Sequence, residues 1–240
     1  MTTPGRLYLV PTPIGNLEDM TSRAVRTLTD VDLVACEDTR HTGQLLSRLN
    51  IKKKLVSYHE HNEQERAAEL VSRMKDGLSV AVVSDAGSPG ISDPGFRIVR
   101  AAIENDIQVV PLPGANSIIP ALTASGLPTD RFFFEGYLSH KSSARLRRLE
   151  QLKDLPHTLV FFESPFRIIK SLNDMLTIFG PRQSCVAREI SKLHEEFIRG
   201  SLDNIVKVCS PRKIKGEIVV VVAGTSFTDK SRPESDEQTE

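Results

Sequence analysis

The sequence LSVAVVSDAGSPGISDPGFRIVRAAIE, from Leu78 to Glu104, decides the fold of this chain. Its first part, Leu78–Val83, is apolar except for one serine, which predicts a strand buried on both faces. Its last part, from Phe96 onward, predicts a helix. Ser84–Gly95 between them holds three glycines and two prolines, so we expect a stiff loop whose backbone can approach a ligand closely. A buried strand that leads directly into a helix is the building unit of a parallel α/β sheet.

The residues around this unit repeat the same alternation of strand and helix. Asn62 and Glu65 form a capping-box pattern at the start of the clearest helix, and Thr21 is the expected cap of the first one. The predicted strands are Arg6–Val10, Val31–Ala35, Lys54–Ser57 and Ile107–Val110, and the further helices are Thr42–Leu49 and Asn62–Met74. The alternation predicts an α/β fold with a mostly parallel sheet.

The segment PLPGANS, Pro111–Ser117, interrupts the alternation because its two prolines and its glycine cannot continue a strand or a helix. We therefore predict two α/β domains, residues 1–113 and 114–224, followed by a disordered acidic tail at 225–240. The strands of the second domain are expected at Phe132–Glu135, Thr158–Phe162, Cys185–Arg188, Glu196–Arg199 and Glu217–Val222, and its helices at Ser142–Lys153 and from Phe166 and Ser201. The apolar run Ile218–Val222 suits a central strand.

Composition and missing motifs exclude several classes of protein. The 240 residues carry 31 basic and 31 acidic side chains, which disfavours a protein coated in basic residues. No apolar run approaches the roughly 20 residues that span a bilayer, and prolines break the N-terminal apolar stretch, so we expect neither a membrane protein nor a signal peptide. Three distant cysteines fit a reducing cytoplasm. G-x-G-x-x-G and G-x-x-x-x-G-K-[ST] are absent, so dinucleotide and ATP sites lose support.

Several loops are candidates for a binding site. Val10–Asn16 and Pro111–Ser117 follow strands as Ser84–Gly95 does, and together they suggest a pocket at the domain junction. Asp85 stands at a strand end, where a carboxylate can accept hydrogen bonds from a ribose or an amine. His59 and His61 lack a third ligand with convincing spacing, so we predict no metal site.

Three mixed-charge clusters leave two interpretations open. Glu37–Arg40, Phe162–Arg167 and Arg188–Lys192 each place acidic and basic side chains near the end of a strand. They are either structural ion pairs or groups that orient a substrate hydroxyl and receive its proton.

Two basic stretches, residues 40–54 and 141–153, are either solvated surfaces or phosphate contacts. The candidate RNA-binding residues in them are Arg40, Lys52, Lys53, Lys54, Lys141, Arg145, Arg147 and Arg148.

Seven motifs, taken in order, resemble one bacterial family. They are LVPTPIGNLEDMTSRAV, ACEDTRHTGQLL, SYHEHNE, VSDAGSPGISDPG, PLPGANS, FEGYL and FFESPFRI. Together they are similar to the ribosomal RNA small subunit methyltransferases I, within the tetrapyrrole methylase superfamily, and the likeness runs from Leu7 to Gly224. One residue departs from the pattern, because Phe166 stands where the family motif E-S-P-H-R has histidine.

The resemblance implies two α/β domains with S-adenosyl-L-methionine in the cleft between them, not a dinucleotide-binding domain. It implies 2′-O-methylation of a cytidine ribose in the decoding region of 16S rRNA, with the small ribosomal subunit as partner and a homodimer as the assembly. The cofactor contacts it implies are Pro11, Gly15, Asp85, Ala86, Gly87, Ile91, Asn116, Ser117, Phe162 and Ala187. The candidate proton acceptors are Glu37, Asp38, Glu163, Glu189 and Lys192. The alternatives are a methyltransferase of the same superfamily that acts on a tetrapyrrole or a modified histidine, and a non-catalytic RNA-binding protein.

Overall fold

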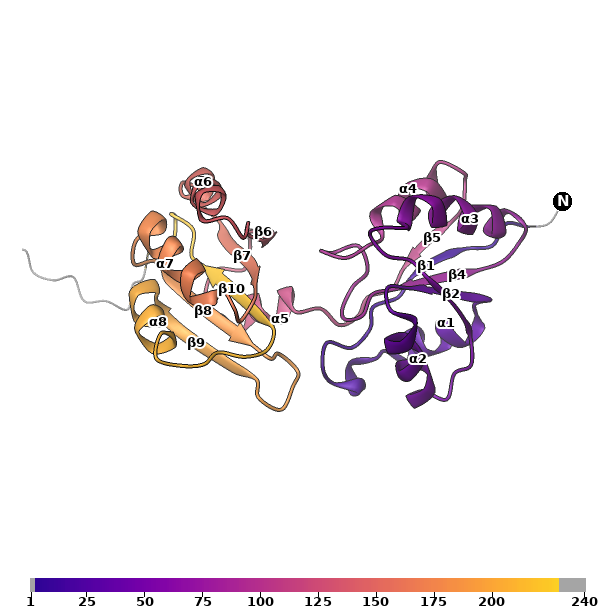
Figure 1. Ribbon diagram of the computed structural model, residues 1–240, viewed down its shortest axis with the longest axis horizontal. Coiled ribbons are helices and arrows are strands. Elements are labelled where there is room, and N and C mark those ends of the chain that lie inside the picture. Colours follow the sequence, from indigo (N-terminus) through magenta and orange to yellow (C-terminus); the bar gives the residue numbers. More distant parts are fainter. Residues whose placement is uncertain (1–2, 229–240) are drawn as a thin grey trace, which may run out of the picture. The chain divides into compact units, whose positions relative to one another are not determined.

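The computed structural model describes residues 3–228 and divides into two compact units, Met1–Ser117 and Ile118–Glu240 (Figure 1). Most of the predicted tail, residues 229–240, lies outside the described residues. Thr225, the first residue of the predicted tail, donates a backbone hydrogen bond to the carbonyl oxygen of Leu155 over 3.1 Å.

The first unit is built on a five-stranded sheet in which every pair of neighbouring strands is parallel. Its strands are β1 (Leu7–Leu9), β2 (Leu33–Cys36), β3 (Lys54–Ser57), β4 (Val80–Val83) and β5 (Val109–Pro111), in the order β3-β2-β4-β1-β5. All four residues of β4 are buried, which confirms the strand predicted from the apolar run. Because the strands are parallel, the loops that follow them all leave from one edge of the sheet.

Helices cover both faces of this sheet (Figure 1). They are α1 (Ser22–Asp30) and α2 (Thr39–Arg48) on one face, with α3 (Glu63–Lys75) and α4 (Phe96–Ile103) on the other. A short 3-10 helix, η1 (Leu17–Asp19), precedes α1. Each face has its own apolar core, since Ala24 and Leu28 of α1 share one cluster while Leu70 and Met74 of α3 share another.

The helix starts confirm one capping prediction and correct another. The Thr21 hydroxyl accepts a hydrogen bond from the backbone N–H of Ala24 over 3.1 Å, as predicted. The capping box at Asn62 is wrong, because the Asn62 amide oxygen accepts from the backbone N–H of His59 and its amide nitrogen donates to the carbonyl oxygen of Ser57. The Asn62 side chain therefore braces the β3–α3 connection instead of capping the helix.

The second unit has a mixed five-stranded sheet. Its strands are β6 (Phe132–Tyr137), β7 (Thr158–Glu163), β8 (Gln183–Arg188), β9 (Glu196–Ser201) and β10 (Ile218–Val222), in the order β6-β7-β10-β8-β9. Only β6 and β7 are parallel, and the other neighbours are antiparallel. All five residues of β10 are buried in the middle of the sheet, which confirms the central position predicted for this run.

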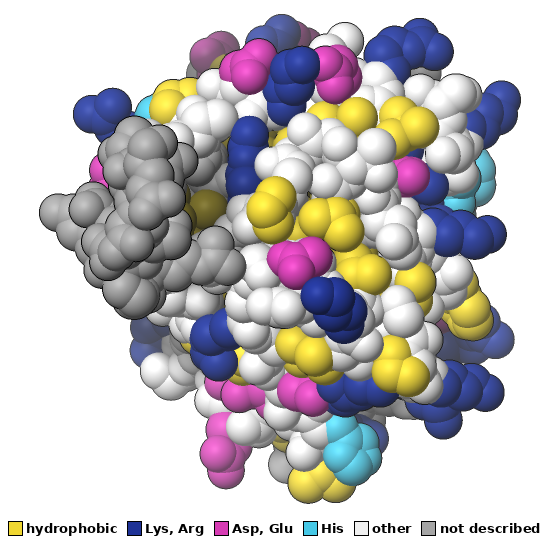
Figure 2. Space-filling view, turned by 90° about the vertical axis from the view of Figure 1, so that its left-hand side faces the viewer, with side chains coloured by type: hydrophobic (Ala, Val, Ile, Leu, Met, Phe, Trp, Pro, Cys, Tyr) yellow, Lys and Arg dark blue, Asp and Glu magenta, His cyan; other side chains and the backbone are white. Residues whose placement is uncertain are grey.

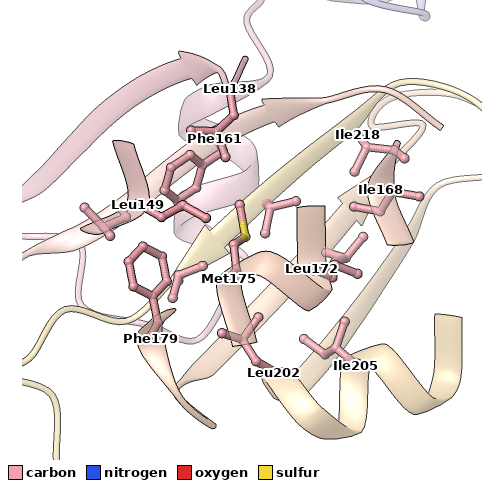
Figure 3. Packing of buried hydrophobic residues seen from close by; sticks show 14 of the residues in the cluster. Leu138, Leu149, Phe161, Ile168, Leu172, Met175, Phe179, Leu202, Ile205 and Ile218 are labelled. Carbon is pink, nitrogen blue, oxygen red and sulfur yellow. The ribbon is translucent and has the colours of Figure 1, made fainter. Parts of the chain in front are cut away.

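The core of the second unit lies on one face of that sheet. It is covered by α6 (Ser142–Leu152), α7 (Ile168–Phe179) and α8 (Leu202–Cys209), while the short helix α5 (Ile118–Thr123) also packs against β10. Phe161 points into this core with Leu172 and Met175 of α7 (Figure 3). Since side chains alternate along a strand, the next residue, Phe162, belongs to the opposite face.

Candidate active site

Three loops meet at the edge of the first sheet where its strands end. The loop after β1 joins the loop after β4 through two backbone hydrogen bonds between Thr12 and Gly87, each 2.9 Å long. The hydroxyl of Thr12 also donates to the carbonyl oxygen of Ser84 over 3.0 Å. Gly87 has a φ of 78°, a conformation that other residues adopt only with strain. Glycine is therefore favoured at position 87 because the backbone pairing with Thr12 holds this residue at a positive φ.

The loop after β5 packs on the other two. The Ser88 hydroxyl donates to the carbonyl oxygen of Ala115 over 3.4 Å. A Cβ atom at Gly114 would lie 2.7 Å from the Cβ of Pro11, so only glycine lets the backbone here come this close to the Pro11 ring. The cofactor contacts proposed in this unit gather on these three loops, namely Pro11, Gly15, Asp85, Ala86, Gly87, Ile91, Asn116 and Ser117. Of these, Gly15, Ala86 and Ile91 are exposed, whereas Pro11 and Gly87 are buried.

The two proposed cofactor contacts of the second unit, Phe162 of β7 and Ala187 of β8, both lie opposite Val219 of β10. Because directly paired residues point to the same side of a sheet, these three side chains share the face opposite to the α7 core. Phe162 also contacts Phe134 and Tyr137 of β6, with ring centroids 4.9 Å and 5.5 Å apart. The face around Phe162 is therefore aromatic and apolar.

Negative charge collects at the loop edge of the first sheet. Burial, followed by the charge of Asp85, raises the pKa of Glu37. Burial and the charges of Glu37 and Asp85 raise the pKa of Asp93 to about 6. The Glu37 carboxylate makes no hydrogen bond or ion pair with any residue that the structure describes. Only the charge of His59 opposes this rise at Glu37, so the site still favours a positively charged ligand.

Asp38 has a structural task. Its carboxylate caps α2 by accepting hydrogen bonds from the backbone N–H groups of Arg40 over 2.7 Å and His41 over 3.3 Å. These hydrogen bonds lower the pKa of Asp38. A carboxylate held in this way is a weak base, so the geometry does not support Asp38 as a proton acceptor.

Glu163 is buried and fully engaged. One of its carboxylate oxygens accepts a hydrogen bond from Ser164 N–H over 2.7 Å and pairs with Arg167 at 3.0 Å, and the other accepts from the Ser171 hydroxyl. Only 2 % of its surface is exposed. This arrangement fixes the turn after β7 and leaves no free oxygen to receive a substrate proton.

Glu189 and Lys192 neutralise each other. Burial raises the pKa of Glu189, but hydrogen bonds from Glu217 N–H and the Lys192 ammonium outweigh it, so the pKa is lowered overall. Burial lowers the pKa of Lys192, but Glu189 at 3.1 Å and Glu217 at 3.2 Å outweigh it, so the pKa is raised. Lys192 therefore stays protonated and Glu189 stays ionised, and neither is suited to take a proton at neutral pH.

The proposed RNA-binding residues divide into exposed and engaged groups. Arg145 is only 4 % exposed and forms an ion pair with Asp174 at 2.6 Å, so its charge is used inside the fold. Arg148 makes two 2.7 Å hydrogen bonds to Glu135. Lys53 donates to the carbonyl oxygen of Val31. The remaining candidates are exposed, namely Arg40, Lys52, Lys54, Lys141 and Arg147, although Arg40 also pairs with Asp38 at 3.4 Å.

The side of the molecule in Figure 2 shows the same mixture of charges. Lysine and arginine side chains lie among aspartate, glutamate and apolar ones on this face, so it is not a continuous basic surface. Within residues 3–228, no group of three His, Cys, Asp or Glu side chains is arranged to hold a metal ion. In the same residues, no helix combines the length and apolarity needed to cross a bilayer.

Two features of the structure escaped the sequence interpretation. Asp93 belongs to the acidic group described above, although only its place in the loop Ser84–Gly95 pointed to it. Leu193 is 93 % exposed, as is Phe166, and nothing in the sequence pattern distinguishes it from a core leucine.

Comparison with known proteins adds to this geometry. A family model described as Tetrapyrrole (Corrin/Porphyrin) Methylases matches residues 6–206. The chain is 48% identical over 230 residues to the Ribosomal RNA small subunit methyltransferase I of Halalkalibacterium halodurans, covering 96% of this chain and 79% of the relative. It is also 48% identical over 235 residues to the protein of that name from Synechocystis, covering 98% of this chain and 84% of the relative.

A solved structure shares the fold. It is titled as uroporphyrin-III C-methyl transferase from Thermus thermophilus complexed with S-adenyl homocysteine, and it superposes with a TM-score of 0.63 at 21% identity, covering 91% of this chain and 97% of that one.

Proposed function

Because this chain belongs to the tetrapyrrole methylase family, and within it to the ribosomal RNA small subunit methyltransferases I, we propose that it methylates ribosomal RNA of the small subunit. The methyl donor is S-adenosyl-L-methionine and the acceptor is the 2′-hydroxyl of a cytidine ribose in the decoding region of 16S rRNA. The observation that carries the proposal is the 48% identity to these relatives over nearly the whole chain. The enzyme is expected to act in the cytoplasm, as a homodimer.

The loop edge of the first sheet fits the methyl donor. S-adenosyl-L-methionine supplies a methyl group on a positively charged sulfonium and also carries an ammonium group. Asp85 and Glu37 provide negative charge at this edge, and the pKa of Glu37 is raised by burial and then by the charge of Asp85, with His59 acting in the opposite direction. Small residues on the joined loops leave backbone groups accessible to a nucleoside. The residues present therefore suit a cationic nucleoside.

Glu37 is the proposed proton acceptor. A ribose hydroxyl attacks well only as its proton leaves, while the new O–C bond forms and the C–S bond of the donor breaks. Of the five candidates, Asp38, Glu163, Glu189 and Lys192 are each held by other groups, whereas the Glu37 carboxylate is not. A raised pKa makes the ionised Glu37 carboxylate a better base than an ordinary carboxylate.

The test uses methyl-labelled S-adenosyl-L-methionine and small ribosomal subunits that lack the modification. We expect label on a cytidine ribose with the native protein, and kcat about 10²–10⁴-fold lower with Glu37→Gln. The donor should still bind Glu37→Gln in calorimetry, though more weakly than it binds the native protein, because the amide keeps the shape of the side chain and Asp85 remains while one negative charge is lost. Glu65→Gln, on an exposed position of α3, is the matched control and should match the native rate. Label found only on a tetrapyrrole or a protein would refute the proposal, as would RNA binding without transfer.

A further inference from the structure

One edge of the second sheet carries two unusually exposed apolar side chains. Phe166 and Leu193 are each 93 % exposed, more than any other large apolar side chain in residues 3–228. Single exposed apolar residues are ordinary on protein surfaces, so exposure alone identifies no site. The hydrogen bonds that hold the turn beneath Phe166 and the exposed lysines at the same edge distinguish this pair from ordinary exposed side chains.

Both side chains belong to the same edge. Glu163 at the end of β7 and Arg188 at the end of β8 pair with the same residue, Ile218, at the start of β10. The segments that follow Glu163 and Arg188 therefore leave the sheet on either side of the segment that enters β10. Phe166 lies in the first of these segments and Leu193 in the second.

The turn that carries Phe166 is held from below. The Ser164 carbonyl oxygen accepts hydrogen bonds from the backbone N–H groups of Arg167 and Ile168, each 3.0 Å long. The Ser164 hydroxyl accepts from Phe166 N–H over 3.3 Å. Glu163, buried beneath the turn, binds Arg167 at 3.0 Å. The exposed ring therefore stands on a fixed base, which reduces the entropy cost when a partner binds it.

Exposed lysines stand in segments at the same edge of the sheet as the apolar pair. Lys213 and Lys215 are exposed in the segment that enters β10, and neither forms an ion pair with a described residue. Lys170, in the first turn of α7, is exposed as well. An exposed planar ring at the same sheet edge as cations outside any ion pair matches an unpaired nucleotide, whose base stacks and whose phosphate is anionic. A protein-docking patch requires a wider apolar area, with charges excluded from its centre.

We propose that Phe166 is a stacking platform for an unpaired nucleobase of the RNA substrate, with Lys213 and Lys215 holding the adjacent phosphates. The inference rests on the proposed function, since it assigns a binding residue for the same substrate. The RNA segment at this edge is single-stranded or has one base turned out of its helix, because a paired base does not offer its face to an aromatic ring.

The chain contains no tryptophan, which gives a direct test. In Phe166→Trp the only indole stands on the proposed platform, and an unmodified transcript of the 16S decoding region should quench its fluorescence while binding with native affinity. Phe132→Trp is the control. Phe132 is 40 % exposed and lies at the end of the sheet where β6 and β7 begin, opposite to the end that carries Phe166. Its fluorescence should not change when the RNA is added.

Phe166→Ala should weaken binding of the same transcript about 5- to 150-fold, as expected when one base no longer stacks on an aromatic ring. The salt dependence of binding should stay the same, because a stacked base releases no counterions. The double variant Lys213→Ala/Lys215→Ala should lower that salt dependence by about 0.7 in log–log slope for each phosphate that is no longer neutralised. Affinity for the methyl donor and the unfolding midpoint should stay native in Phe166→Ala.

The inference and the proposed function fail in different ways. If the native protein methylates rRNA but Phe166→Ala binds the transcript normally, or Phe166→Trp shows no quenching, the stacking role is refuted and the function stands. If Phe166→Ala loses RNA affinity only together with a lower unfolding midpoint, the residue is structural and the inference is overturned. If the native protein neither binds the transcript nor transfers a methyl group, the proposed function itself fails.

Discussion

Arg145→Ala separates the structural role of helix α6 from its proposed role in RNA binding. The guanidinium of Arg145 pairs with the Asp174 carboxylate at 2.6 Å and donates to the carbonyl oxygen of Ser139 over 3.1 Å. Arg145 is only 4 % exposed, whereas the Asp174 side chain is 20 % exposed. Alanine removes the cation and leaves a mostly buried carboxylate and a carbonyl oxygen without their partner.

The expected cost follows from these interactions. Removing one partner of a buried ion pair costs about 3–5 kcal/mol. Water still reaches part of Asp174, so we expect the lower end of that range, about 3 kcal/mol. Urea denaturation of the two proteins, followed by circular dichroism, should show a lower midpoint at an unchanged slope. A double-mutant cycle with Asp174→Ala should return a large coupling energy, because the second change removes the orphaned charge.

Arg147→Ala is the matched control on the same helix. Arg147 is exposed and forms no ion pair with a described residue. The unfolding free energy of the Arg147→Ala protein should therefore stay within about 0.5 kcal/mol of the native value. If Arg147 contacts RNA, its removal should lower the salt dependence of binding. A native denaturation midpoint in Arg145→Ala, combined with loss of RNA affinity, would refute the structural assignment.

Two further substitutions test the carboxylates. Glu163→Gln removes the charge that holds Arg167, so the unfolding free energy should fall by about 1.5–3 kcal/mol. The pH profile of methyl transfer should stay native, because Glu163 is not the proposed base. An altered pH profile would contradict this assignment. The pKa of Asp93 is raised to about 6, first by burial and then by Glu37 and Asp85, so folding favours its protonated form. The contribution of protonated Asp93 to folding stability is fully present below its ordinary pKa of 3.8 and is lost as the pH rises through about 6. Asp93→Asn should therefore have a higher urea midpoint than the native protein near pH 8 but not near pH 4. If the urea midpoint of Asp93→Asn differed from the native midpoint by the same amount at both pH values, the stability change would not come from ionisation of Asp93.

The sequence predicted those parts of the fold in which local pattern and tertiary environment agree. The run Ile218–Val222 has no polar alternation, and the strand it forms is buried in the middle of its sheet. The first unit follows from alternating strands and helices, since parallel strands need long crossovers. The mixed sheet of the second unit was harder to predict, because the short β8–β9 connection permits antiparallel pairing and the place of β10 depends on residues distant in sequence.

The charged residues show where sequence interpretation ends. Arg145 and Arg147 look alike in a basic stretch, yet two residues span about half a helical turn, so Arg145 is buried and pairs with Asp174 of α7 while Arg147 is exposed. Glu163 ends a strand and Glu37 directly follows one, and an arginine comes soon after each, yet only Glu163 is enclosed by hydrogen bonds. Burial and partner geometry distinguish these residues, and both arise from tertiary packing.

The place of β10 bears on how a nascent chain acquires its structure. The first sheet has all its strands once Pro111 has emerged from the ribosome, so that unit can form early in synthesis. In the second sheet, β7 and β8 are both complete some thirty residues before β10, the strand that joins them, has been made. During that interval each presents an unpaired apolar edge, which is a hazard for aggregation. A premature stop codon before Ile218 would therefore yield a complete first unit attached to two separate strand pairs, β6–β7 and β8–β9, each with an unpaired apolar edge. Such a product is prone to aggregate and is a target for chaperones and proteases.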